Sequence, residues 1–295
     1  MSQSAATATA PQSPATSTHT AHDVGSLAAA FDRDGFAFPL RAMSTAQAEA
    51  YRQELETIEA RIADDKARRR CLRRYPNLVL PFVDEITRRP EITDAVAELL
   101  GPDLLVLDCP FFIKEPRSEA FVSWHQDLHY WGLQSDDEVT AWVALTPATT
   151  ANGCMRFVAG SHTQRVDHVD THDARNLLTR GQEIAVDVDE SEATEGELAA
   201  GEFSLHNGRV FHASHPNTSD ARRIGLAIRY IPTRMQQAPG GSMSAMLVRG
   251  EDTYGHFNLT RRPSGVMTDA DVAYWEEISG ARNRVLFKSD DAPTQ

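Results

Sequence analysis

The stretch SWHQDLHYWGL, residues 123–133, contains side chains that are able to bind a divalent metal. His125 and Asp127 are separated by one residue, so both side chains point to the same face if the segment is extended. An imidazole and a carboxylate directed at one point can hold a metal ion. The same two residues can also be an ordinary polar pair on a strand, and the spacing alone leaves both interpretations open.

A site with two histidines and one carboxylate needs a third ligand from elsewhere in the chain. The candidates lie in residues 201–233 and are His206, His212 and His215. The first two flank the Asn207-Gly208 turn of a predicted hairpin, whereas His215 lies in a cluster of turn residues that would hold a ligand poorly. Spacing does not separate His206 from His212.

Arg223 favours His212 as the third ligand. It opens the predicted strand RIGLAIRY, which is expected to run beside the strand that carries His212. A guanidinium binds a carboxylate through two parallel hydrogen bonds, which lysine does less well. A dicarboxylate that chelates the metal at one end and contacts Arg223 at the other would join the two features.

The elements that must position these residues are mainly strands. From residue 103 onward, short β-rich segments alternate with turn residues, and they supply roughly eight strands, the count of a jelly-roll barrel. Helices are predicted before them, including one that Ser44 and Gln47 open with a capping box and one over residues 90–100. The expected fold class is mainly β with flanking helices.

The expected organisation is a disordered tail over residues 1–22, followed by one domain over residues 23–290. Within that domain we expect a helical part over 23–101, a jelly-roll core over about 103–235 and a C-terminal extension over 236–290. No internal repeat or linker is visible between residues 23 and 290.

Composition narrows the class of protein. The 295 residues carry a net charge of −13, which argues against a nucleic-acid-binding surface. No apolar run approaches the ~18–20 residues that span a bilayer, and the N-terminus has no secretory signal pattern. The three cysteines show neither a metal-binding spacing nor a disulfide framework. We therefore expect a cytoplasmic protein without a membrane or nucleic-acid partner.

Several motifs resemble the phytanoyl-CoA dioxygenase family over roughly residues 100–235. They are HQDLHY, AWVAL, NGCMRFVAGSH and HASHPNTSDARRIGLAIRYIP. The resemblance implies a double-stranded β-helix (jelly-roll, cupin-like) barrel and a reaction that uses Fe(II), 2-oxoglutarate and O2. It implies His125, Asp127 and His212 as the iron ligands.

The resemblance also implies a set of residues that bind the co-substrate. Arg223 would bind the distal carboxylate of 2-oxoglutarate with help from Ser214, Trp142 would lie near it, and Lys114 is expected to face the same pocket. Related halogenases have a small residue in place of the carboxylate. The presence of Asp127 therefore favours a hydroxylase that oxidises an unactivated C–H bond of a small organic molecule and releases succinate and CO2.

Two other classes of function stay open. One is a cupin-like metal-binding barrel without oxygenase activity, an isomerase or a ligand-binding protein, which the presence of Arg223 disfavours. The other is a demethylase acting on nucleic acid or protein, and the acidic charge argues against nucleic acid.

Four features concern the substrate and the surface. His129 is expected to contact the substrate or to be a hydrogen-bonded residue of the pocket wall. Arg180, in an expected lid over residues 174–183, is expected to contact the substrate or to pair with a surface acid. His168 and His172 lie in a polar loop and are expected to be solvated. Residues 247–263 are expected to contribute to the pocket or to a contact between two copies of the chain in a homodimer.

Overall fold

The structure is a computed structural model, and it describes residues 26–178, 181–239, 241 and 243–286. The predicted tail over residues 1–22 lies outside these ranges. The α-helices are α1 Leu27–Asp34, α2 Thr45–Arg61, α3 Lys66–Cys71, α4 Pro81–Thr87, α5 Pro90–Leu100 and α6 Asp269–Leu286. Short 3-10 helices are η1 Pro76–Leu78, η2 Asp127–Tyr130, η3 Thr150–Asn152, η4 Ser161–Thr163 and η5 Glu190–Glu192.

The strands form two main sheets and a separate hairpin. The large sheet runs in the order β1 Phe36–Arg41, β10 Glu202–Asn207, β5 Val139–Ala144, β12 Arg223–Pro232, β2 Leu104–Asp108, β13 Ser244–Arg249 and β14 Asn258–Leu259, with β3 Phe111–Lys114 also paired to β12. The smaller sheet runs β4 Val122–His125, β11 His212–Ser214, β6 Met155–Val158 and β9 Ala193–Gly196. The hairpin pairs β7 His168–Asp170 with β8 Gln182–Ile184.

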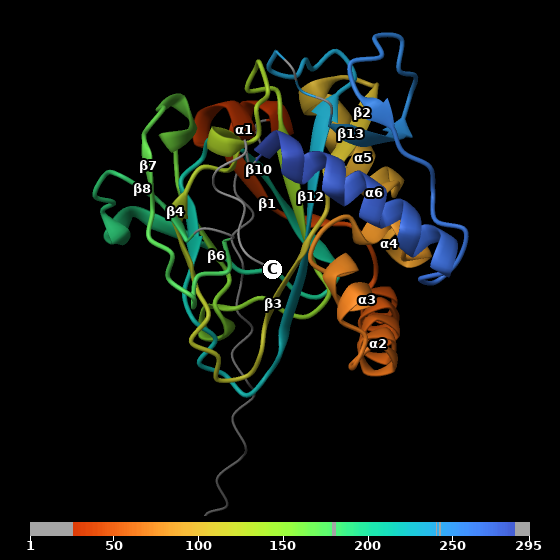
Figure 1. Cartoon of the computed structure of the whole chain (residues 1–295). Coiled ribbons are helices and arrows are strands. Elements are labelled where there is room, and N and C mark those ends of the chain that lie inside the picture. The colour runs from red at the N-terminus through yellow and green to blue at the C-terminus, as the bar shows by residue number, and fades with distance from the viewer. Residues whose placement is uncertain (1–25, 179–180, 240, 242, 287–295) are drawn as a thin grey trace, which may run out of the picture.

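The large sheet separates the helices from the interior between the two sheets. In Figure 1, α2, α3, α4 and α6 lie on one side of it, and β4 and β6 of the smaller sheet lie on the other. Strand β5 shows the alternation that this arrangement requires. Val139, Ala141 and Val143 pack into the core shared with the helices, whereas Thr140 and Trp142 line the pocket between the sheets.

Local sequence explains the two helices that the sequence predicts most clearly. Ser44 caps α2 through the complete capping box with Gln47, as expected. Pro90 begins α5 and Gly101 ends it, also as expected. The charged run at residues 64–74 contains the short helix α3, which Asp65 caps.

The Asn207-Gly208 turn does not form the predicted hairpin. Strand β10 pairs with β1 and β5 in the large sheet, whereas β11 pairs with β4 and β6 in the smaller one. Residues 208–211 carry the chain from one sheet to the other, with Val210 and Phe211 buried on the way. The prediction that the strand of Arg223 runs beside that of His212 is wrong for the same reason. The two strands belong to sheets that face each other across the pocket.

Segments from outside residues 103–235 also take part in the sheets and their packing. Strand β1 lies at one edge of the large sheet, and β13 pairs with β2 near the other. Helix α6 contacts the N-terminal helices, where Trp275 donates to the carbonyl of Arg74 at 2.7 Å. The architecture is mainly β with flanking helices, as predicted. Among the described helices, none has the length and apolar character needed to cross a bilayer.

Candidate active site

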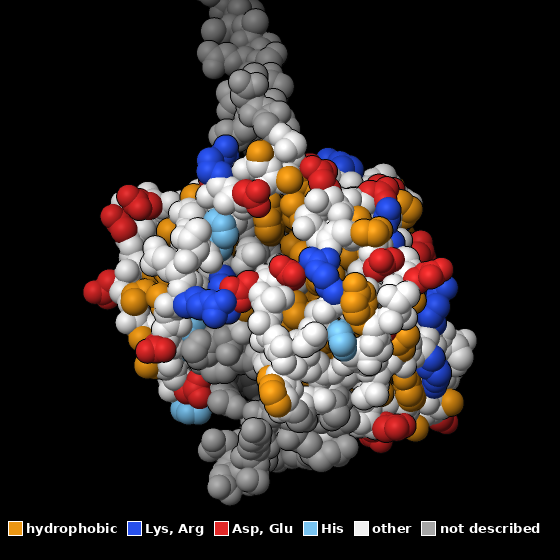
Figure 2. All heavy atoms as spheres, turned by 90° about the horizontal axis from the view of Figure 1, so that it is seen from above, with side chains coloured by type: hydrophobic (Ala, Val, Ile, Leu, Met, Phe, Trp, Pro, Cys, Tyr) orange, Lys and Arg blue, Asp and Glu red, His pale blue; other side chains and the backbone are white. Residues whose placement is uncertain are grey.

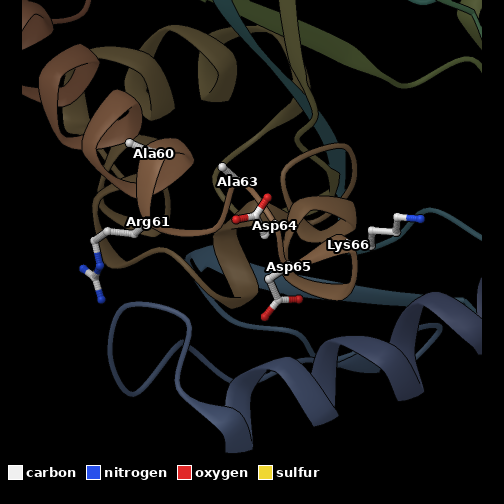
Figure 3. A pocket seen from close by; sticks show the side chains of 6 residues that line it. All are labelled: Ala60, Arg61, Ala63, Asp64, Asp65 and Lys66. Atoms are coloured by element: carbon white, nitrogen blue, oxygen red, sulfur yellow. The ribbon is translucent and has the colours of Figure 1, made fainter.

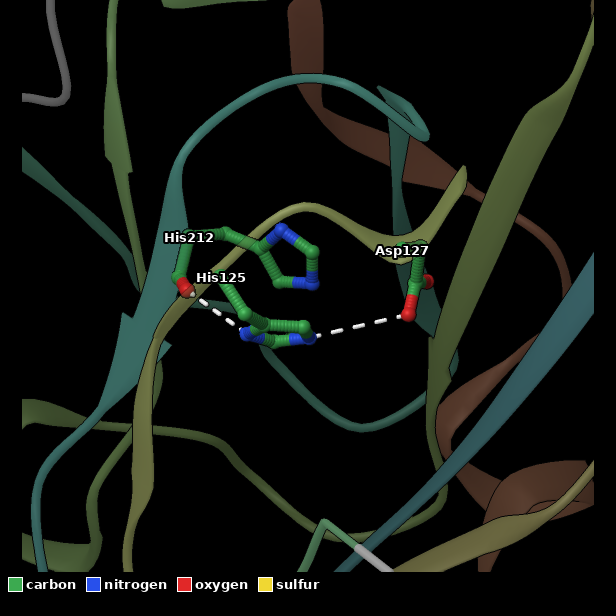
Figure 4. Close-up of side chains that lie close together, drawn as sticks. All are labelled: His125, Asp127 and His212. Carbon is green, nitrogen blue, oxygen red and sulfur yellow. Dashed lines mark hydrogen bonds and ion pairs between the residues drawn. The ribbon is translucent and has the colours of Figure 1, made fainter. Parts of the chain in front are cut away.

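His125, Asp127 and His212 converge in the space between the two sheets. His125 ends β4 and Asp127 begins η2, while His212 begins β11 and pairs with His125 in register. One potential ligand atom from each residue lies within 4.8 Å of the others, and all three side chains are buried. Figure 4 shows both rings and the carboxylate directed toward a common point, with 3.6 Å between Nε2 of His125 and Oδ1 of Asp127.

The outer nitrogens of both rings already have backbone partners. Nδ1 of His125 lies 2.9 Å from the carbonyl oxygen of Ser123 and 3.0 Å from that of His212. Nδ1 of His212 lies 3.0 Å from the carbonyl oxygen of Val210. A carbonyl can only accept, so each Nδ1 carries the proton and each Nε2 is left with a free lone pair. Two such imidazoles and one carboxylate fit a divalent metal of the first transition row.

The electrostatic environment keeps Asp127 ionised. Burial by itself raises the pKa of this carboxyl, but the nearby guanidinium of Arg229 and the two neighbouring histidines lower it by more. The pKa of Asp127 therefore lies well below its usual value. Arg229 is buried, with 3.5 Å between its Nη2 and Oδ1 of Asp127, and its guanidinium lies over the ring of Trp131. Arg229 is a residue of the site that was not predicted from the sequence, although its even spacing from Arg223 along one strand places both on the same face.

The two other candidate histidines are placed differently. His206 is buried in the pocket with its ring centroid 4.8 Å from that of His212, and burial lowers its pKa to about 4. It does not belong to the group of converging ligand atoms that the described residues form. His215 is exposed, and its Nε2 lies 3.9 Å from a carboxylate oxygen of Glu190. The geometry thus separates His212 from both alternatives.

A second part of the pocket is cationic. Arg223 begins β12 and pairs in register with Lys114 of β3, and both side chains are almost completely buried. Nζ of Lys114 donates to the hydroxyl of Ser214 at 2.6 Å and also to the carbonyl of His215. Arg223 donates to the carbonyl of Gly153 through Nη1, while its buried Nε has no partner.

These two cations have no carboxylate partner within the described part of the chain. Burial, and after it the charge of Arg223, lowers the pKa of Lys114 to about 6. Burial likewise lowers the pKa of Arg223 to about 10. A buried charge without a counterion is costly, so this arrangement is suited to a ligand that brings a negative charge.

Trp142 shapes the cationic part of the pocket. The Arg223 guanidinium lies over its ring, 5.2 Å from the centroid. The same ring crosses β12 directly over Gly225, where a Cβ atom would come within 1.9 Å of the indole. Glycine at position 225 is therefore what allows Trp142 to lie beside Arg223.

The two predicted substrate contacts are not placed by the structure. Arg180 lies outside the described residues. The backbone of His129 belongs to η2, but its side chain is outside the described part. The apolar lining of the pocket comes instead from residues on five strands, namely Phe112, Val122, Met155, Ala213 and Ala227.

Other surface features of the described residues carry no comparable chemistry. A depression at the turn between α2 and α3 is lined by Ala60, Arg61 and residues 63–66, and Figure 3 shows Arg61 and Lys66 directed away from each other. Asp65 in this depression already caps α3 and pairs with Arg68. On the face in Figure 2, acidic and basic side chains are interspersed rather than gathered by sign.

Comparison with known proteins identifies the class to which this fold and site belong. The family model described as phytanoyl-CoA dioxygenase matches residues 31–225. A curated protein of Stutzerimonas stutzeri, named a probable alpha-ketoglutarate-dependent hypophosphite dioxygenase, is 31% identical over 228 residues, which are 75% of each chain. The chain belongs to the phytanoyl-CoA dioxygenase family, and the resemblance predicted from its motifs is confirmed.

Solved structures agree with this assignment. The apo form of a non-heme monooxygenase, ThoJ, superimposes with a TM-score of 0.80 at 38% identity, covering 88% of this chain and 97% of that one. CytC3 with Fe(II) and alpha-ketoglutarate superimposes with a TM-score of 0.59 at 23% identity, covering 82% and 97%. The second likeness is evidence for the fold alone.

Proposed function

We propose that this protein is an Fe(II)- and 2-oxoglutarate-dependent dioxygenase that hydroxylates an unactivated C–H bond of a small organic molecule. The observation that carries the proposal is the presence, in one pocket, of a converging His-Asp-His group and a pair of buried cations without a carboxylate partner among the described residues. With the co-substrate and O2, iron bound there supplies oxidation of a C–H bond, and succinate and CO2 are released.

His125, Asp127 and His212 are the residues that would hold the iron. The backbone carbonyls at Nδ1 fix the tautomer of both imidazoles, so Nε2 of each is free to donate a lone pair. Arg229 keeps the Asp127 carboxylate charged, as a metal ligand must be. Three protein ligands leave other coordination positions for co-substrate and oxygen.

Arg223, Lys114 and Ser214 would bind the remote carboxylate of 2-oxoglutarate. The free Nε of Arg223 and the three donors of the Lys114 ammonium match the acceptor oxygens of a carboxylate. Trp142 would hold the arginine from the other side through the contact of its ring with the guanidinium. We also propose that the two facing sheets form the double-stranded β-helix of the family, because the chain belongs to that family and the proposed site lies between the sheets.

The substrate would occupy the apolar part of the lining, which excludes water from the reacting C–H bond. Asp127 supports hydroxylation rather than chlorination, because its carboxylate would serve as a protein ligand to the iron, where related halogenases have a small residue. His129 and Arg180 remain proposed substrate contacts.

The test is an anaerobic titration of the purified apoprotein with Fe(II) and then 2-oxoglutarate, followed by visible spectroscopy. We expect a weak metal-to-ligand charge-transfer band in the wild-type protein and none in Asp127→Ala or His212→Ala. Iron binding without the band would contradict co-substrate binding and would favour a cupin-like barrel that does not activate oxygen. Screening of small molecules by succinate release then identifies the substrate.

A further inference from the structure

Gln126, the residue between the two ligands His125 and Asp127, is held by both its backbone and its side chain. Its backbone N–H donates to Nε2 of His168 at 2.9 Å. Its side-chain amide donates to the carbonyls of Gln164 at 2.7 Å and Arg209 at 2.6 Å. Gln126 is only 1% exposed, and its three bonds are part-buried.

The bond with His168 defines the state of that imidazole. Nε2 of His168 accepts from Gln126, so it carries no proton, and Nδ1 must be the donor to the carbonyl of Val166 at 3.2 Å. The expectation that His168 is solvated is therefore wrong. The reason is a contact across 42 residues that the polar composition of its loop does not indicate.

The segment around His168 is fixed against the metal-binding strand at further points. Asn176 donates to the hydroxyl of Ser123 at 2.7 Å, and that hydroxyl donates to the carbonyl of Gln182. The backbone of Phe121 bonds to that of Arg175 and of Leu177. The segment over residues 164–184, apart from 179–180, is thus bonded at several points to residues 121–126.

Gln126 connects the segments that carry all three proposed ligands. It lies between His125 and Asp127, and its side chain contacts the carbonyl of Arg209, three residues before His212. Rotation of the peptide at Gln126 would move the Asp127 carboxylate relative to the His125 ring, and the bond to His168 opposes that rotation.

We propose that Gln126 and His168 are positioning residues that fix the geometry of His125 and Asp127 for metal binding. The inference rests on the proposed function, because it treats these two residues as iron ligands. Changes in residues that orient metal ligands commonly weaken metal affinity by roughly 10–100-fold. His168 is expected to act in the same way through the backbone of Gln126.

The test is a titration of the full-length apoprotein with Co(II) chloride, read from the visible bands of the bound ion. His168→Phe keeps a ring but removes the acceptor, and we expect its Co(II) affinity to fall by roughly 10–100-fold. His168→Gln places an acceptor oxygen near the position of Nε2 and is expected to restore affinity to within about threefold of wild type. His172→Asn, at an exposed position of the same segment, is the matched control and should bind as wild type.

Each outcome is decisive. Wild-type affinity in His168→Phe, or failure of His168→Gln to restore affinity, overturns the inference while the proposed function stands. A wild-type protein that binds no Co(II) overturns both. If His168→Phe does not fold, as judged by circular dichroism, Gln126→Met removes the side-chain bonds at nearly constant length, and wild-type affinity in that variant also overturns the inference.

Discussion

The two parts of the pocket satisfy their charged and polar groups in opposite ways. Around His125, Asp127 and His212, the outer ring nitrogens have backbone partners and the carboxylate has an arginine nearby. Around Lys114 and Arg223, two cations lie side by side, buried, and without a carboxylate among the described residues.

This difference indicates what each part requires from a ligand. In the metal-binding part, the lone pairs are already directed to one point, which suits a cation. In the cationic part, burial makes the charged forms of Lys114 and Arg223 unfavourable, and a bound anion stabilises them. The two parts should therefore respond separately to substitution.

The largest effect is expected at the metal-binding part. His212→Ala removes one of three ligands and should lower Fe(II) affinity by more than the roughly 10–100-fold typical of changes around the ligands. His206→Ala removes a histidine whose ring centroid lies 4.8 Å from that of His212 but which lies outside the ligand group. This variant should keep an Fe(II) affinity within about threefold of wild type. Anaerobic Fe(II) titration measures both. Equal losses in the two variants would contradict the assignment of His212 over His206.

A smaller effect is expected at the cationic part. Hydrogen bonds to charged groups contribute about 1.5–3 kcal/mol, so Arg223→Leu should weaken 2-oxoglutarate binding by roughly 10–150-fold. Fe(II) affinity in the absence of 2-oxoglutarate should be unchanged, because Arg223 contacts none of the proposed ligands. Arg223→Lys is the control that keeps the charge and loses the planar donors. Parallel loss of iron binding in Arg223→Leu would show that the two parts are not independent.

Lys114 should make co-substrate binding depend on pH. With a pKa of about 6, the free lysine is charged below pH 6 and neutral above it. An anion binds the charged form, so binding above pH 6 requires proton uptake, and affinity should fall by up to about tenfold per pH unit as pH rises.

The measurement is the dissociation constant of 2-oxoglutarate on iron-saturated protein between pH 6 and 8. Lys114→Met should bind more weakly and show no such slope. A slope that persists in Lys114→Met would assign the proton to another group.

The smallest effect lies away from the pocket. Ser44→Ala removes the capping box of α2 and should cost about 1 kcal/mol of stability, which lowers Tm by about 2–4 °C. Affinities for Fe(II) and 2-oxoglutarate should not change. Calorimetry and the two titrations together check this, and an altered affinity would mean that general destabilisation contributes to the effects at the pocket.

Features with a local cause were predictable from the sequence. The capping box of α2, the Pro and Gly that bound α5, and the strand-rich chain after residue 103 all follow from neighbouring residues. The same holds for His125 and Asp127, whose side chains share a face because the backbone at Gln126 is extended.

Pairing across long distances in the chain was not predictable. The Asn207-Gly208 turn is typical of a hairpin, yet β10 and β11 belong to different sheets because the chain crosses between them. Turn residues report the local direction of the backbone, not which strand will accept its hydrogen bonds.

The family, the expected ligand types and the extended geometry of the HxD motif all follow from the sequence, because each is recognised from short motifs of neighbouring residues. The separation of His206 from the ligand group, the position of Arg229 beside Asp127 and the bond between His168 and Gln126 depend on the tertiary structure. The contact between Gln126 and His168 joins residues 42 positions apart, and the contact between Asp127 and Arg229 joins residues 102 positions apart. Their partners are selected by burial, which forces polar groups from distant segments to satisfy one another.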